Sequence, residues 1–195
     1  MSNDPFLFLF HYNFIDIKEE NNMSNKNTLS QINLEGVRVT YKNFAGAETK
    51  SQDGRVFNRN HDRYFSVVLD EEMARDFEAQ GMNVRWPKHP DGTIDMNRNP
   101  TVQVKVSSGP EIFASVHIFL VSQNNVQRIP NDNQDVLSSL DNMFFSNCDL
   151  VVRPRAWEVN GNTGVTLYLQ TGYFNIDESS KFEDPYAEKY GTKGF

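Results

Sequence analysis

Apolar and polar residues alternate in short segments along most of the chain. In the segment 62–70, for example, Phe65, Val67 and Leu69 fall on one face of an extended chain. Alternation with a period of two is typical of strands that are buried on one side. Six segments are predicted strands: 32–44 (INLEGVRVTYKNF), 62–70 (DRYFSVVLD), 101–108 (TVQVKVSS), 111–122 (EIFASVHIFLVS), 148–159 (CDLVVRPRAWEV) and 164–176 (GVTLYLQTGYFNI).

One segment breaks this pattern and indicates a helix. The stretch DEEMARDFEAQG has acidic residues at its start, apolar residues at helical spacing and Gly81 at its end. These are start and stop signals of a helix, which we predict from about Asp70 to Gln80. A weaker helix or turn is predicted from Asp135 to Asn142. The stretches 45–63 and 86–100 are rich in turn-forming residues and are predicted long loops, which are usually functional or disordered.

About six strands with one short helix and long loops favour a mainly β fold. We predict an OB-fold-like barrel of five or six strands, with a β-sandwich as the alternative. The barrel is expected to span residues 31–176. Residues 1–30 are expected to be a disordered extension. Its first part, residues 1–22, is expected either to precede a usual start at Met23 or to form an added edge strand over 5–15. Residues 177–195 are expected to form a flexible acidic tail.

The charge of the chain does not mark it as a strongly basic nucleic-acid-binding protein. The net charge is −7, but much of it lies at the two ends, and the body of the chain from 23 to 176 carries only −2. A near-neutral body can still present one basic groove. No run of apolar residues is long enough for a membrane helix. The single cysteine, Cys148, excludes an intrachain disulfide and fits the cytoplasm as the expected location.

The sequence offers little for catalysis. None of its four histidines has zinc-ligand spacing with another histidine or with the cysteine. No phosphate-binding loop, nucleophile elbow or dinucleotide fingerprint is present. His61 lies in RNHDR, which faintly resembles a nuclease loop, but the carboxylates or histidines of a metal site are not readable around it. We therefore expect no enzyme activity, no cofactor and no metal.

Arginines and lysines interleaved with aromatic residues give a better indication of function. Cations that follow a phosphate backbone and rings that stack on bases are what single-stranded nucleic acid requires. On the strand 148–159, period two places Arg153, Arg155 and Trp157 on one face, and Pro154 predicts a position at a sheet edge or bulge. Core packing remains an alternative for Trp157, and the favoured one for Tyr41, Tyr168, Phe174 and Phe44. The predicted contact residues are Arg38, Lys42, Arg59, Arg63, Trp86, Lys88, Arg153, Arg155 and Trp157.

Three stretches carry a resemblance to a known family. LEGVRVTYKNFAG, RYFSVVLDEEMARDFEAQGMNVR and DLVVRPRAWEVNGNTGVTLYLQTGYFNI resemble, in order and character, bacteriophage single-stranded DNA-binding proteins loosely grouped with the T7-type replication proteins. The likeness covers roughly residues 31–176. It implies a five-stranded OB barrel with an added helix. It also implies sequence-independent coating of single-stranded DNA during phage replication or recombination, in the cytoplasm of the host cell.

The resemblance also implies partners. Such proteins often end in an acidic tail with a terminal aromatic residue, which docks phage or host replication proteins. The matching residues here are Asp177, Glu178, Glu183, Asp184 and Phe195. Lys189 and Lys193 dilute the acidity of this tail and weaken the expectation of docking. A second copy of the chain, in a homo-oligomer, is a further expected partner. The competing interpretations are a phage structural or assembly protein with a β-barrel or sandwich fold, and an enzyme such as a nuclease.

Overall fold

The computed structural model describes residues 30–107, 116–122, 125–130 and 133–176. Two predicted segments lie outside these ranges. They are the extension, apart from residue 30, and the acidic tail 177–195 with its docking residues. The same holds for the first half of the predicted strand 111–122.

Five strands close into a barrel. They are β1 (Ile32–Asn43), β4 (Arg63–Val68), β6 (Thr101–Val106), β9 (Phe145–Val159) and β10 (Asn162–Ile176). The order around the barrel is β6–β4–β1–β9–β10, and a parallel pairing of β10 with β6 closes the circle. The other four pairings in the barrel are antiparallel. The prediction of a mainly β, OB-fold-like barrel is confirmed, and the β-sandwich alternative is wrong.

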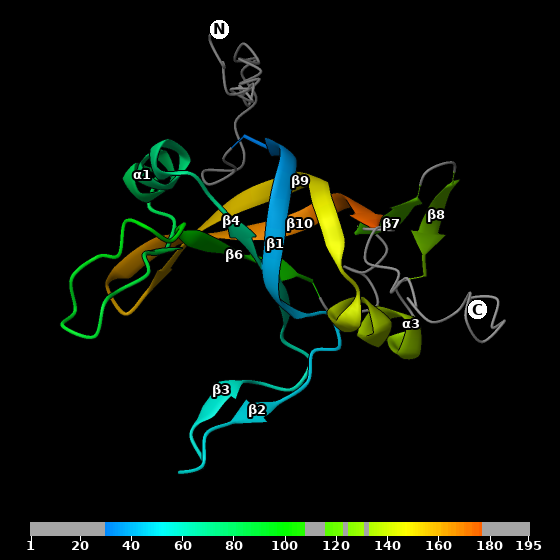
Figure 1. Cartoon of the computed structure of the whole chain (residues 1–195). Helices are drawn as coiled ribbons and strands as arrows, with labels where there is room; N and C mark the ends of the chain where they lie inside the picture. The colour runs from blue at the N-terminus through cyan, green and yellow to red at the C-terminus, as the bar shows by residue number, and fades with distance from the viewer. Residues whose placement is uncertain (1–29, 108–115, 123–124, 131–132, 177–195) are drawn as a thin grey trace, which may run out of the picture.

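Further strands extend this barrel. β5 (Val84–Arg85) pairs with β6, while β7 (His117–Ser122) pairs with β10 and carries β8 (Asn125–Ile129) at the edge of the sheet. β2 (Thr49–Lys50) and β3 (Val56–Asn58) form a separate two-stranded hairpin. This hairpin lies inside the stretch 45–63, so the prediction of a simple loop there is wrong. Figure 1 shows it projecting away from the barrel.

Both predicted helical segments form. α1 (Glu71–Ala79) begins after Asp70, whose side chain accepts a hydrogen bond of 2.8 Å from the backbone N–H of Met73. Its buried residues share one face because of their helical spacing. α3 (Gln134–Ser139) and the short 3-10 helix η1 (Leu140–Asn142) occupy the weaker predicted segment. In the view of Figure 1, α1 and α3 lie on opposite sides of the barrel.

Three phenylalanines form the centre of the core. Phe44, Phe65 and Phe174 are each fully buried, with ring centroids 5.5–5.7 Å apart in one stacked and two edge-to-face pairs. Asp141 of η1 fixes Phe44 by accepting hydrogen bonds from the backbone N–H groups of Phe44 (2.6 Å) and Ala45 (3.0 Å). The predicted core positions of Phe44 and Phe174 are confirmed.

Candidate nucleic-acid interface

Aromatic and cationic side chains alternate in one row across four strands of the barrel. The strand registers place Tyr64 of β4 opposite Lys105 of β6, and Lys105 opposite Tyr168 of β10. Tyr168 in turn lies opposite Arg153 of β9. We call these four residues the cross-strand row. Neighbouring strands lie about 4.8 Å apart, so the row presents rings and cations at short, regular intervals.

The cross-strand row lies on the outer surface of the barrel. The sequence neighbours Phe65, Val104 and Leu167 are buried inside, and period two therefore turns the row outward. Tyr168 is half-buried, and the guanidinium carbon of Arg155 lies 5.5 Å from the centroid of its ring. This contact falls within the range of a cation–π interaction. Arg153, Arg155 and Trp157 are exposed on the same face of β9, as period two predicted.

Trp157 stands near the tip of the β9–β10 hairpin. Its side chain is 43% exposed, so the alternative of a core tryptophan is wrong. Gly164 lies opposite it, and a Cβ built there would come within 2.6 Å of the indole ring. The absence of a side chain at Gly164 therefore allows the indole to lie flat against β10. The turn has two residues, Asn160 (φ 52°) and Gly161 (φ 77°), and an Asn-Gly pair is favoured there because both positions need a positive φ.

Pro154 lies where the sequence placed it, on a part of β9 with one neighbour. The last register pair between β1 and β9 joins Ile32 to Val152, and Pro154 follows beyond it. Pro154 itself pairs with Leu167 of β10. Because proline cannot donate a ladder hydrogen bond, it is tolerated here, and the prediction of an edge position is confirmed.

Other predicted cations are accessible but lie apart from the cross-strand row. Arg38 is exposed on β1 and lies opposite Val68 of β4. Val68 lies opposite Thr101 of β6. Thr101 in turn lies opposite Arg85 of β5, which is exposed. A second row on the same outer surface thus has an arginine at each end. Arg59 is exposed in the loop after β3, and Lys88 is exposed in the loop 86–100.

Lys42, a predicted contact residue, does not share the outward face of Arg38, although the two lie an even number of positions apart on one strand. A bulge between Thr40 and Asn43 shifts the register of β1, which reverses the alternation. The ammonium of Lys42 donates to the carbonyl oxygen of Met143 and lies 4.8 Å from the ring centroid of Phe145. Partial burial lowers the pKa of Lys42. Its charge thus holds β1 to the start of β9, and we leave it out of the interface.

Arg63 is a structural residue of the barrel in this structure. It is 7% exposed and pairs with Val106 on the inward face of β4. Its guanidinium hydrogen-bonds to the side chain of Gln134, whose amide donates to the carbonyl oxygen of Ala45 at 2.7 Å. Burial lowers the pKa of Arg63. Arg63 and Tyr64 are adjacent on β4, so their side chains point to opposite faces. Because Tyr64 faces outward, Arg63 faces away from any ligand on the outer surface.

Trp86 fastens the loop 86–100 to α1. Its indole Nε1 donates to Glu78 at 2.8 Å, and the guanidinium carbon of Arg75 lies 5.4 Å from the ring centroid. The residue is half-buried and packs against the core. One face of the ring is therefore covered by the protein, and its role as a stacking platform remains a prediction.

Tyr64, Lys105 and Tyr168 were not among the predicted contact residues. The alternation in RYFSVV and TVQVKV was enough to predict that Tyr64 and Lys105 face outward. Only the strand registers show that they are neighbours. Tyr168 was assigned to the core in preference to a stacking platform, whereas the structure places it on the outer surface. Tyr41 was assigned to the core too; that prediction is wrong, since its side chain is 72% exposed.

Within the described ranges, no group of three or more His, Cys, Asp or Glu side chains is arranged to hold a metal ion. No helix in this part of the chain combines the length and the apolar character needed to cross a membrane.

Comparison with known families identifies the domain. A family model described as "Putative phage ssDNA-binding domain" matches residues 22–191, which is most of the chain. The chain belongs to this phage single-stranded DNA-binding family. The family resemblance inferred from the sequence is thereby confirmed, whereas the T7-type grouping stays a prediction. No curated protein matches the chain.

Solved structures similar to this chain come from the same class of phage protein. The single-stranded DNA-binding protein from bacteriophage Enc34, in a C-terminal truncation, has a TM-score of 0.45 and 10% identity, with 76% of this chain and 86% of that chain covered. The same Enc34 protein in complex with single-stranded DNA has a TM-score of 0.42 and 10% identity, with coverages of 80% and 93%.

Proposed function

We propose that this chain binds single-stranded DNA without sequence preference across the outer surface of β4, β6 and β10. The observation that carries the proposal is the cross-strand row, in which tyrosine rings and cations alternate over four paired strands. Membership of the phage single-stranded DNA-binding family supports the same conclusion.

The chemistry of the row matches an unpaired strand. Each base exposes a π-face that stacks on an aromatic ring, a contact worth about 1–3 kcal/mol per base. Each phosphate carries a charge that a neighbouring lysine or arginine neutralises, with release of counterions. Tyr64 and Tyr168 supply rings, while Lys105, Arg153 and Arg155 supply charge. Neither contact reads the identity of the base, so the row favours general coating.

The elements beside the row extend the binding path. OB-type barrels bind oligonucleotides on one strand face and on the loops at its sides. Here the stretch 45–63 with the β2–β3 hairpin and Arg59 lies on one side, and the β9–β10 hairpin with Trp157 on the other. A strand that crosses the row would meet both. Trp157, exposed against Gly164, is placed to stack on a base at that end.

The biological role we propose is non-catalytic protection of single-stranded DNA in phage replication or recombination. Docking of replication proteins on the acidic C-terminal residues and formation of a homo-oligomer belong to this proposal as well. The docking is supported by the acidic residues and the terminal Phe195 in the sequence of residues 177–195.

Fluorescence-anisotropy titration of the full chain with a labelled oligo-dT of about 30 nucleotides tests the proposal, because this length exceeds the site sizes of OB folds. A duplex of equal length serves as the nucleic-acid control. Tyr64→Ala and Tyr168→Ala should each weaken binding, by about fivefold to a hundredfold for the loss of one stacked base.

Tyr173→Ala is the matched control variant. Tyr173 lies on β10 as well, but near its end, where its ring stacks on Phe119 at 4.7 Å. Its removal should leave affinity unchanged. Equal binding to duplex and single strand, or no binding at low salt, would refute the proposal and favour a structural role in phage assembly.

A further inference from the structure

An open hollow of about 540 Å³ lies on the outer surface beside β1. This volume is within the range of small-ligand sites, roughly 300–1,000 Å³. Arg38 and Tyr41 line it from β1, and Asn97, Arg98 and Asn99 line it from the loop 86–100. Val68 of β4 is part of its lining as well. We call it the outer hollow.

The outer hollow lies within reach of a strand bound at the cross-strand row. Val68 and Tyr64 are both on β4, and both face outward because they are an even number of residues apart. Four residues of extended chain separate them by roughly 13 Å. A nucleotide adjoining the row can therefore enter the hollow.

Tyr41 is held at the hollow in an unusual conformation. Its φ of 46° lies in the left-handed region, which is uncommon for a non-glycine residue and costs energy. The bulge between Thr40 and Asn43 produces this turn of the chain and directs the side chain outward, where it is 72% exposed. A large ring that is held exposed at backbone cost indicates a contact surface.

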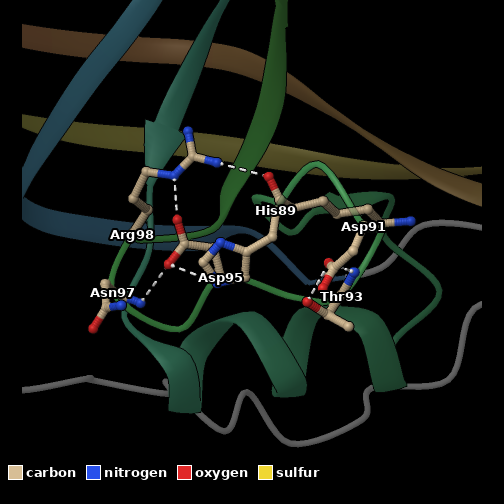
Figure 2. Close-up of polar contacts among 7 residues, drawn as sticks. His89, Asp91, Thr93, Asp95, Asn97 and Arg98 are labelled. Carbon is tan, nitrogen blue, oxygen red and sulfur yellow. Dashed lines mark hydrogen bonds and ion pairs between the residues drawn. The ribbon is translucent and has the colours of Figure 1, made fainter.

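The opposite wall is prearranged by Asp95, as Figure 2 shows. Asp95 accepts hydrogen bonds from Arg98 Nε at 2.8 Å and from the backbone N–H of Asn97 at 3.0 Å. Arg98 also donates to the carbonyl oxygen of Lys88 at 3.0 Å. The hydrogen bond from Arg98 holds the pKa of Asp95 below its usual range, so the carboxylate stays charged. A wall fixed before binding reduces the entropy lost when a ligand enters.

The chemistry of the hollow differs from that of the cross-strand row. The row offers rings and charges, whereas the lining of the hollow also includes two residues that carry amides, Asn97 and Asn99. Asparagine pairs with N6 and N7 of adenine, and arginine pairs with O6 and N7 of guanine. Both donate to N7, an atom that purines have and pyrimidines lack. The residues around the hollow thus favour a purine edge, with Tyr41 available to stack on its face.

We propose that the outer hollow receives one purine base of the bound strand and recognises it through N7. This proposal rests on the proposed function, since the strand must first bind at the cross-strand row. It adds a purine preference at one position to binding that is otherwise independent of sequence.

The test compares three labelled oligonucleotides of about 12 thymidines, a length within the range of OB-fold site sizes. One is all thymidine, one carries a single central deoxyadenosine, and one carries 7-deaza-deoxyadenosine at that position, which lacks only N7. The full chain should bind the adenosine oligonucleotide about five- to tenfold more tightly than the other two, as for one well-formed base contact.

Two variants locate the preference. Asn97→Ala with Asn99→Ala, and separately Tyr41→Ala, should remove the adenosine preference and leave affinity for the all-thymidine strand intact. Asn125→Ala, at an exposed position of the edge strand β8, is the matched control and should keep the preference.

The outcomes separate this inference from the proposed function. Equal affinity for all three oligonucleotides would overturn the purine site while the coating function stands. A preference that survives loss of Asn97 and Asn99, or that 7-deaza-adenosine retains, would overturn it too. Failure to bind any of the strands would refute the proposed function and this inference together.

Discussion

The cations beside the tyrosines give a sharp quantitative prediction. Replacing Lys105, Arg153 and Arg155 together by glutamine keeps side chains of similar length and removes three positive charges from one surface. Lys105 has an acidic neighbour, with 3.9 Å between its ammonium and the carboxylate of Asp62, and Arg155 lies over the ring of Tyr168. None of the three is part of the barrel core, so the triple variant should fold.

The expected effect is on the salt dependence of binding. For single strands, each neutralised phosphate contributes about 0.7 to the slope of log K against log salt concentration, so the triple variant should lose about 2. Raising the salt from about 50 to 200 mM lowers the affinity of both proteins by some factor. That factor should be roughly fifteen times larger for the wild type than for the triple variant. Removal of the guanidinium over Tyr168 should in addition lower the free energy of unfolding by about 0.5–1 kcal/mol.

Anisotropy titrations with oligo-dT at four or five salt concentrations measure this slope. Arg128→Gln is the matched control, because Arg128 lies on β8 next to His117 at the edge of the sheet. It should leave the slope unchanged. The reasoning would be wrong if the triple variant bound more weakly with the same slope, since its cations would then not contact phosphates. If Arg128→Gln lowered the slope by as much per charge removed as the triple variant does, the salt dependence would reflect the net charge of the protein and not contacts at this surface.

Three predictions concern the barrel itself. Burial raises the pKa of Cys148 to about 12, so the thiol should stay protonated and resist a disulfide reagent at pH 8 until urea unfolds the chain; rapid reaction of the native protein would contradict this. In urea titrations, Phe65→Ala should destabilise the fold by about 3–5 kcal/mol, whereas Phe57→Ala, at a 71% exposed position, should change stability by less than about 0.5 kcal/mol. Asp141→Ala should cost about 1–3 kcal/mol by orphaning two backbone N–H groups, and Asp141→Asn, which keeps an acceptor, should cost less.

Local sequence was a good guide wherever one residue type fixed the backbone. Asp70 begins α1 as predicted because its carboxylate satisfies an N–H group that the first turn leaves without a partner. Pro154 marks the part of β9 that has only one neighbour, because a proline lacks the donor that a second neighbour would need. These interactions span a few residues and are readable without the fold.

The candidate site was less predictable because it depends on strand register. Lys42 follows the same alternation as Arg38 in the sequence, but the bulge at Tyr41 turns it to the opposite side. Arg63 reads as an exposed loop arginine, although the pairing of β4 with β6 buries it. A shift of one residue exchanges the two faces of a strand, and a bulge has no reliable signature in a single sequence.

The sequence by itself determined a mainly β barrel, its two helical segments and the character of a phage single-stranded DNA-binding domain. These follow from periodicity, capping and a family pattern that runs along the chain. Only the tertiary structure decided which residues share a surface. Tyr64, Lys105 and Tyr168 are separated by 41 and 63 positions in the sequence and become neighbours through hydrogen-bonded pairing of β4, β6 and β10. That pairing is set by the packing of the whole barrel core, because each strand buries its apolar face only in one register.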